Sequence, residues 1–237
     1  MIYNIRPGTF GTIRMGDLVA VCNLIQHLRI HNHPDLKFYL EEGSMDSSEH
    51  VKLFHAHLLR YTDLFSKEPG TETLPWSKVN LWDFRAITKD VVSLPNRETM
   101  QRKIVIFPLY DAPYNTYRNW PAGKLTQYLR DYSFKYPSYE KIVCIANKDL
   151  LKEVPDENIA RISTDFLTNL WHIRTAEIFI GGDTGTTHFA FSLDHGPKEL
   201  VYCMSGRGLL HTAPFHLLSG KGKLDEYWLD FEGSRFS

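Results

Sequence analysis

The chain has 237 residues, 43% of them hydrophobic and 23% charged, so it can bury a sizeable core and wholesale disorder is excluded. With 27 Lys and Arg residues against 28 Asp and Glu residues, its net charge is −1, which argues against an extended basic surface that coats nucleic acid. It carries neither a signal-peptide pattern nor an apolar run of about 18 residues, so we expect no transmembrane segment and a cytoplasmic protein.

Four elements are predicted in the first part of the chain. Residues 2–5 form a short apolar strand, and a glycine-containing loop connects it to a helix whose apolar side chains recur at helical spacing from 18 to 28. Asp17 stands at the start of that helix, either as its N-cap or in its first turn. A strand at 36–40 and a helix at 48–61 follow. This order is typical of a parallel α/β sheet.

Strands and helices alternate again after a polar segment at 94–103, which is the best candidate for a linker. Strands are expected at 104–107, 142–146, 177–180 and 200–204, and helices at 121–136, 166–174 and 184–193. We therefore expect an α/β fold of two small Rossmann-type domains, 1–97 and 98–237, with parallel sheets that face each other across a cleft. Ligands bind at the carboxyl ends of the strands in such sheets.

The three cysteines, Cys22, Cys144 and Cys203, are scattered and each stands among apolar neighbours. This pattern is neither a disulfide framework nor a metal motif, so reduced core thiols are expected.

The strongest chemical signal follows the strand at 177–180. Gly181 and Gly182 come next, and a helix then begins in a hydroxyl-rich run at 184–187. The first N–H groups of a helix lack internal partners and lie at the positive end of its dipole, so this helix start suits a phosphate or diphosphate. The alternative is an ordinary helix start that Asp183 caps.

Two further places could carry chemistry. Arg118 comes shortly before the helix start at Pro121, where its guanidinium could hold an anionic oxygen, although a surface pair with a carboxylate is the commoner role. Asp17 would usually be a helix cap, but at the mouth of a cleft it could take a proton from a substrate hydroxyl.

Three motifs, in order, resemble one family. The run 182–185 reads Gly-Asp-Thr-Gly and is followed by His188, which is similar to the Asp-Thr-Gly…His signature of the heptosyltransferase-like glycosyltransferases (glycosyltransferase family nine, GT-B superfamily). Met-Gly-Asp at 15–17 resembles the family's N-terminal Gly-Asp turn, and Arg-Asn-Trp-Pro at 118–121 resembles its basic residue followed by Trp-Pro. The region between the two halves is short for the family, so the chain looks like a compact, divergent member.

The resemblance implies an inverting GT-B glycosyltransferase that moves a sugar from a nucleotide-diphospho-sugar to an acceptor hydroxyl. Residues 1–97 would be the acceptor side and 98–237 the donor side. By position, Asp17 would be the general base, and Arg118 would stand where the family has a Lys that stabilises the leaving diphosphate. No Asp-x-Asp motif occurs in the chain, in agreement with a mechanism that needs no metal and no other cofactor.

Residues at these motifs, and in the loop after the strand at 200–204, are the expected donor-binding residues: Gly16, Arg14, Trp120, Asp183, Thr184, Gly185, Thr186, Thr187, His188, Ser205, Gly206 and Arg207. Three aromatic residues are candidates for acceptor binding, with core packing as the alternative: Phe10, Tyr114 and Tyr117. The acidic residue that would hold a ribose stays open among Asp149, Asp165 and Glu177.

Two acceptor classes compete. One is a saccharide or glycolipid; the other is a hydroxylated DNA base, which would make the chain a viral enzyme of the host cytoplasm. The near-neutral charge weakens the DNA alternative, although a local patch of Arg6, Arg14, Arg29 and Lys37 could serve it. A nucleotide-sugar-binding protein without transfer activity is a further alternative.

His27 and His31 are spaced i, i+4 and could pair on a metal. With no third ligand in view, surface or capping roles are expected and no metal site is assigned.

Overall fold

The computed structural model of the chain describes residues 1–31, 33–75, 81, 99–108, 119–120, 123–145, 160–203 and 222–225. The chain divides into two compact units, Met1–Arg97 with Ser192–Asp194, and Glu98–Phe191 with His195–Ser237. Each unit is described by itself.

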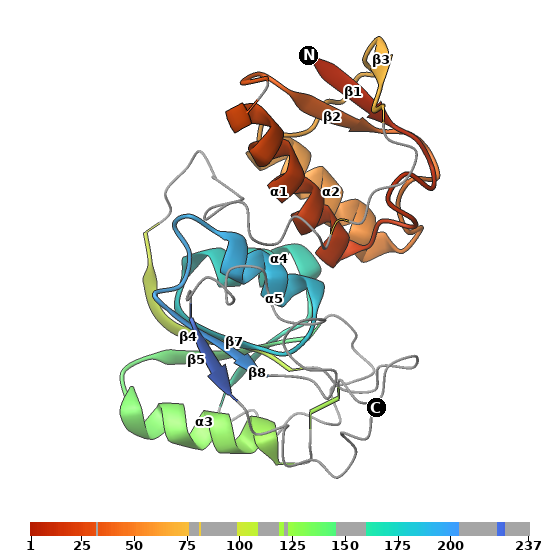
Figure 1. Ribbon diagram of the computed structural model, residues 1–237. Coiled ribbons are helices and arrows are strands. Elements are labelled where there is room, and N and C mark those ends of the chain that lie inside the picture. The colour runs from red at the N-terminus through yellow and green to blue at the C-terminus, as the bar shows by residue number, and fades with distance from the viewer. Residues whose placement is uncertain are drawn as a thin grey trace, which may run out of the picture. The chain divides into compact units, whose positions relative to one another are not determined.

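The first unit contains a parallel sheet and two helices (Figure 1). In chain order its elements are β1 (Ile2–Ile5), α1 (Met15–His31), β2 (Lys37–Leu40), α2 (Glu49–Tyr61) and β3 (Glu72–Thr73). The strand order is β2-β1-β3, and both neighbours run parallel to β1. The loop after β1 therefore leaves from the middle of the sheet.

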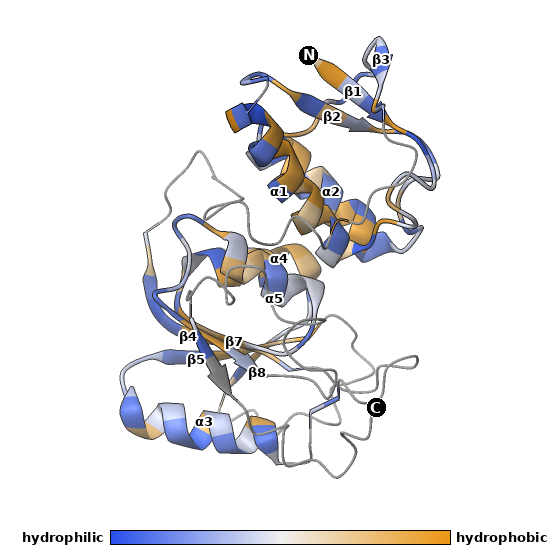
Figure 2. Cartoon of the chain, in the orientation of Figure 1, coloured by the Kyte–Doolittle hydropathy of each residue, from blue (hydrophilic) through white to orange (hydrophobic). Residues whose placement is uncertain are grey.

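Helix α1 is a core helix. The sequence predicts one apolar face, but the structure also buries Val19, Ala20 and Leu24, which lie between the residues of that face. Figure 2 shows α1 as hydrophobic along most of its length. A helix that is apolar on most sides is enclosed by its surroundings. The start of α1, and Asp17 with it, is thus held firmly.

The second unit contains a six-stranded sheet in which all strands run parallel. In chain order its elements are β4 (Gln101–Phe107), α3 (Lys124–Lys135), β5 (Glu140–Cys144), β6 (Arg161–Ser163), α4 (Phe166–Thr175), β7 (Ala176–Gly181), α5 (Gly185–Ser192), β8 (Glu199–Cys203) and β9 (Lys223–Asp225). Helices α4 and α5 lie on one face of this sheet and α3 lies on the other (Figure 1).

The strand order of the second unit is β6-β5-β4-β7-β8-β9. Numbered within the unit, this is the order 3-2-1-4-5-6 of doubly wound nucleotide-binding folds. The order reverses between β4 and β7, and in doubly wound sheets ligands bind at the carboxyl ends of the strands at such a point. The residues after β4 and after β7 therefore decide what the unit can bind.

The α/β class with parallel sheets is confirmed, and the differences fall at element ends and at sheet edges. Strand β4 begins at Gln101, inside the predicted linker, whose residues 94–98 lie outside the described part of the chain. Helix α3 begins at Lys124, not at 121. The sequence prediction missed β3, β6 and β9, because short edge strands lack the continuous apolar run of a strand that is buried on both faces.

Two kinds of buried side chain stand out. None of the three cysteines forms a disulfide bond, and all three are buried, as expected. Lys103, in β4, is only 1% exposed; its Nζ lies 3.2 Å from Nδ1 of His172 and 4.0 Å from the centre of the Trp171 ring. The aromatic ring and the imidazole nitrogen stabilise the buried ammonium group.

Candidate functional site

The loop between β1 and α1 is fixed at both of its ends. Gly8 and Gly11 have φ angles of +83° and +71°, in the region that glycine adopts without strain. The N–H of Ile13 donates to the Ser44 carbonyl at 3.0 Å, and the Ile13 carbonyl accepts from the N–H of Asp46 at 2.8 Å. The loop after β1 is thereby attached to the loop after β2, just before α1 begins.

Asp17 lies in the first turn of α1, as one of the two predicted placements has it. The backbone N–H of Arg14 donates to Asp17 Oδ2 at 2.9 Å, which is one half of a capping box. Burial raises the pKa of Asp17 above its ordinary value of 3.8, against the smaller opposing effects of the Arg14 N–H and the Arg14 charge. A carboxylate with a raised pKa is a stronger base. Gly16, beside it, is half-buried.

Asp46 is a second carboxylate near Arg14, which the sequence analysis missed. Its Oδ1 accepts from the N–H of Ser48 at 2.9 Å. Hydrogen bonds from Ser48 lower the pKa of Asp46, and the Arg14 charge lowers it further. Two carboxylates whose pKa values are shifted in opposite directions suit different roles. Asp17 is the better proton acceptor; the Asp-x-Ser spacing before α2 was the signal for Asp46.

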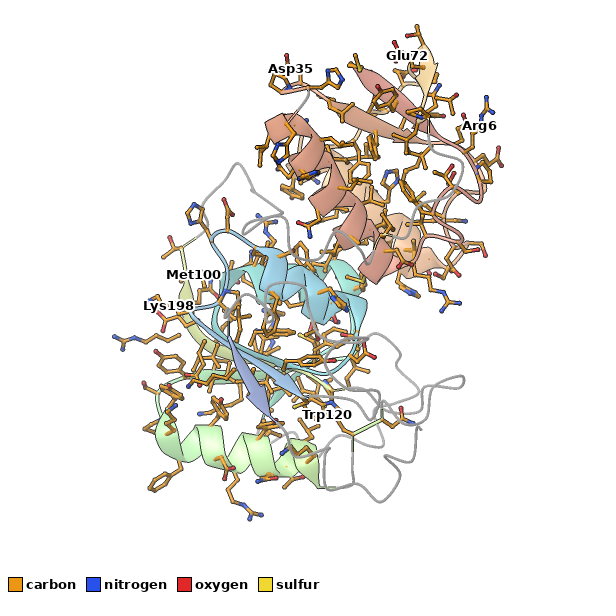
Figure 3. All side chains as sticks on the ribbon, in the orientation of Figure 1. Arg6, Asp35, Glu72, Met100, Trp120 and Lys198 are labelled. Carbon is orange, nitrogen blue, oxygen red and sulfur yellow. The ribbon has the colours of Figure 1, made fainter. Side chains whose placement is uncertain are left out.

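The predicted basic patch does not form. Arg29 donates from Nε to the Leu36 carbonyl at 2.7 Å and pairs through Nη1 with Asp63 at 2.9 Å, next to the amino end of β2. Lys37 is the first residue of that strand, whereas Arg6 and Arg14 follow the carboxyl end of β1. Figure 3 shows Arg6 and Asp35 at opposite ends of the sheet. The four basic residues therefore fall into two pairs, because in a parallel sheet the residues at the amino ends of the strands lie far from those at the carboxyl ends.

The start of α5 combines glycines with buried hydroxyl groups. Thr184 caps the helix: its Oγ1 accepts from the N–H of Thr187 at 3.3 Å, and its carbonyl accepts from the N–H of His188 at 3.2 Å. The alternative of Asp183 as the cap is therefore wrong, since the helix begins one residue later than that alternative requires. Thr184 Oγ1 also lies 2.7 Å from Thr186 Oγ1 and 3.1 Å from Thr187 Oγ1.

The segment that leads into α5 and the helix itself bury several polar side chains. Five polar residues of this segment are at most 8% exposed: Asp183, Thr186, Thr187, His188 and Ser192. In the described part of the chain, no acceptor bonds to the backbone N–H of Gly185 or Thr186, as expected for the first turn of a helix. These amides and the dipole give the helix start a positive potential that suits an anion.

Glycines let the backbone approach its neighbours closely at this turn. A Cβ on Gly181 would collide with Thr187 Oγ1 and the Phe179 ring, and a Cβ on Gly182 would lie 2.7 Å from Nε1 of Trp120. Trp120 follows β4 and Gly182 follows β7, so the contact joins the two loops at the point where the strand order reverses. Figure 3 shows Trp120 at one end of the strands and Met100 and Lys198 at the other.

Two further residues at this end of the sheet were not predicted from the sequence. They are Lys124 and Tyr128, on the first two turns of α3. The Trp120 and Tyr128 rings are 5.4 Å apart, and Tyr128 Oη lies 2.6 Å from Cys203 Sγ at the end of β8. Lys124 Nζ lies 4.7 Å from the centre of the Tyr128 ring, and only 5% of Lys124 is exposed. A lysine in the first turn of the helix predicted at 121–136 was the available signal.

Several predicted residues receive no structural description. Six lie outside the described residues: Arg118, Tyr114, Tyr117, Ser205, Gly206 and Arg207. Phe10 is half-buried in the loop before α1, between the buried Thr9 and the exposed Gly11. Its role in acceptor binding stays a prediction.

Of the three candidates for holding a ribose, two have other partners. Glu177 accepts from Tyr139 Oη and pairs with Lys198 Nζ at 3.3 Å, at the amino end of β7. Asp165 caps α4, accepting from the N–H of Thr168 at 2.7 Å. Asp149 lies outside the described residues.

The His27 and His31 rings contact each other, with centroids 4.4 Å apart. Within the described ranges, no three His, Cys, Asp or Glu side chains gather into a ligand set for a metal ion. No described helix is both long and apolar enough to span a bilayer.

No protein-family model and no curated protein sequence matches the chain. Among solved structures, the iron-containing dodecameric glycosyltransferase TibC of enterotoxigenic Escherichia coli is similar with 13% identity and a TM-score of 0.51, over 88% of this chain and 59% of that one. A glycosyltransferase family nine protein of Veillonella parvula is similar with 11% identity and a TM-score of 0.47, over 86% of this chain and 79% of that one. The Escherichia coli heptosyltransferase WaaC with ADP is similar with 10% identity and a TM-score of 0.48, over 93% of this chain and 96% of that one.

The fold is that of the GT-B glycosyltransferases. The expected resemblance to the heptosyltransferase-like glycosyltransferases is confirmed at the level of the fold.

Proposed function

We propose that the chain is an inverting glycosyltransferase that moves a sugar from a nucleotide-diphospho-sugar to an acceptor hydroxyl. The observation that carries the proposal is the start of α5. There, donor-rich backbone follows the glycines after β7, next to the strand-order reversal of a glycosyltransferase fold. Nucleotides bind at this place in doubly wound sheets.

In the proposed reaction the two helix starts have complementary tasks. Asp17 takes the proton of the acceptor hydroxyl while its oxygen forms a bond to the anomeric carbon. The bond from that carbon to the diphosphate oxygen breaks, and the diphosphate leaves with the electron pair. The amides of Gly185 and Thr186, together with Arg118, stabilise the negative charge that develops there. A single displacement inverts the anomeric centre.

A saccharide is the favoured acceptor. The DNA alternative needed a local basic patch. The four residues of that patch lie in two pairs, one at the amino ends of the strands and one at the carboxyl ends. Phosphate contacts supply most of the affinity of proteins for DNA. The exposed loop before α1, with Phe10 and two arginines, offers an aromatic ring and polar groups of the kind that saccharides contact.

The test is a screen of nucleotide-diphospho-sugars by thermal shift, followed by mass-spectrometric measurement of nucleoside diphosphate release. Oligosaccharides form one acceptor arm and hydroxymethylated DNA the other. Release with a saccharide, and its loss in Asp17→Asn, is the expected result. If no nucleotide-sugar stabilises the protein, the proposal fails. If donors bind and no acceptor or water ever yields product, the protein is a binding protein without transfer activity.

A further inference from the structure

Trp120 buries a hydrogen-bond donor that has no acceptor among the described residues. The side chain is only 4% exposed, and its Nε1 is fully buried with no hydrogen-bond partner in the part of the chain that the structure describes. Leaving such an N–H unpaired costs free energy, a cost that an aromatic side chain without a polar atom would avoid. Buried unpaired groups of this kind are uncommon and call for an explanation.

The indole nitrogen lies beside the turn that leads into α5. The position of a Cβ on Gly182 would be 2.7 Å from Nε1, so the absence of a side chain at 182 is what allows the nitrogen to reach the turn. The amides of Gly185 and Thr186, which also bond to no described acceptor, begin the helix three residues further on. Unpaired donors thus come from two loops, one after β4 and one after β7.

The ring is held in this position by its neighbours. Tyr128 packs against the indole at 5.4 Å between centroids, and its hydroxyl group contacts Cys203 Sγ at 2.6 Å. Buried aromatic rings that are fixed on several sides do not turn to find another acceptor. A donor held in a fixed orientation is effective toward an anion, because the ring itself does not have to turn when the anion binds.

We propose that the indole N–H of Trp120 donates a hydrogen bond to an oxygen of the diphosphate that binds at the start of α5. The inference rests on the proposed function and assigns to Trp120 a role in diphosphate binding beyond packing. Gly182 is the matching requirement, since any side chain there would separate the indole from the turn.

The test observes the indole N–H directly. The chain has five tryptophans, so ¹⁵N labelling yields five indole signals, and Trp120→Phe identifies the one from Trp120. Inorganic pyrophosphate is the probe, because it carries the diphosphate without committing to a base. We expect the Trp120 signal to move downfield during the titration, in step with the amides of Gly185 and Thr186. The signal of Trp171, which lies on α4 and contacts Lys103 of β4, serves as the control and should stay in place.

Affinity gives the second readout. Trp120→Phe should weaken pyrophosphate about tenfold or more, as expected for a lost hydrogen bond to a charged group, while Trp171→Phe should leave affinity unchanged. If the α5 amides shift and the Trp120 indole does not, the inference is wrong and the proposed function stands. If pyrophosphate moves neither set of signals, both fail. If Trp120→Phe does not fold, Trp→Phe changes at the other four tryptophans assign the Trp120 signal by elimination, so the wild-type titration still decides the matter.

Discussion

Helices α1 and α5 both begin after a loop at the carboxyl end of a parallel strand, yet their first turns offer opposite chemistry. At α1 the first turn contains the Asp17 carboxylate, whose pKa is raised and which accepts a hydrogen bond from the N–H of Arg14. At α5 a threonine caps the helix, hydroxyl groups fill the first turn, and two amides have no described acceptor. One start is suited to accept a proton and the other to donate to an anion. The difference comes from side chains, because the backbone arrangement is the same.

The largest expected effect is on the proton-accepting start. Asp17→Asn keeps an oxygen for the Arg14 N–H but removes the base, so the rate of sugar transfer should fall by about 10²–10⁴. Pyrophosphate affinity should not change, since the anion site is at the other helix. The check is steady-state kinetics together with calorimetry of pyrophosphate binding. Retention of full transfer by Asp17→Asn would remove Asp17 from the mechanism.

The pH profile sharpens the same point. Because the pKa of Asp17 is raised, its carboxylate is lost at a higher pH than that of an ordinary aspartate. Transfer should therefore decline as the pH falls through a value above 3.8, and Asp17→Asn should abolish this acidic limb. A limb that persists in Asp17→Asn would assign it to another group.

The next effect concerns stability in the second unit. Burial, followed by the Lys103 charge, lowers the pKa of His172 to about 4, below its ordinary value of 6.5. Between pH 6.5 and 4, His172 binds a proton more readily in the unfolded chain than in the folded one. The contribution of His172 to the free energy of unfolding is therefore fully present above pH 6.5 and falls as the pH is lowered toward 4. The loss amounts to at most about 3 kcal/mol at 1.36 kcal/mol per pH unit.

Denaturant unfolding at pH 7 and pH 5 measures this effect. His172→Asn keeps an acceptor for Lys103 but does not titrate, so the free energy of unfolding should vary less with pH than in wild type. In the first unit, burial likewise lowers the pKa of His55 to about 4, and His55→Gln is the matched variant there. An unchanged pH dependence in both variants would contradict the assignment.

A smaller effect is expected from Gly181, the glycine that precedes the proposed anion site at the start of α5. Gly181→Ala places a Cβ against Thr187 Oγ1 and the Phe179 ring, and such overpacking costs roughly 1–3 kcal/mol. Pyrophosphate affinity should fall as Thr187 is displaced. Gly123→Ala is the control, because its φ of +80° brings strain but nothing lies near its Cβ. Equal losses of pyrophosphate affinity in the two variants would refute a specific role for Gly181.

The smallest effect separates capping from binding. Thr184→Ala removes the cap of α5 and should cost about 1 kcal/mol of stability, with weaker pyrophosphate binding. Thr62→Ala removes a hydroxyl that donates to the Leu58 carbonyl at the end of α2, and it should leave pyrophosphate affinity unchanged. Thermal unfolding and calorimetry of the two variants make the check. Should Thr184→Ala bind pyrophosphate like wild type, the hydroxyl serves the helix alone.

The parts of the fold that the sequence predicted are those with a strong local pattern. The apolar runs of β4 and β7 are buried on both faces, and such strands read as continuous hydrophobic segments. The pairs that form only through packing were not predictable: Lys103 with His172, Trp120 with Gly182, and Tyr128 with Cys203. Their members are far apart in the chain, and no periodicity connects them.

By itself, the sequence determined the alternation of strands and helices, the place of Asp17 at the start of a helix, and the glycine- and hydroxyl-rich start of another. These are local properties that spacing and residue type encode. Only the tertiary structure decided the strand order that brings Trp120 to Gly182, the burial that raises the pKa of Asp17, and the separation of the four basic residues. Strand order and burial depend on how distant elements pack, so they appear only when the sheet is assembled.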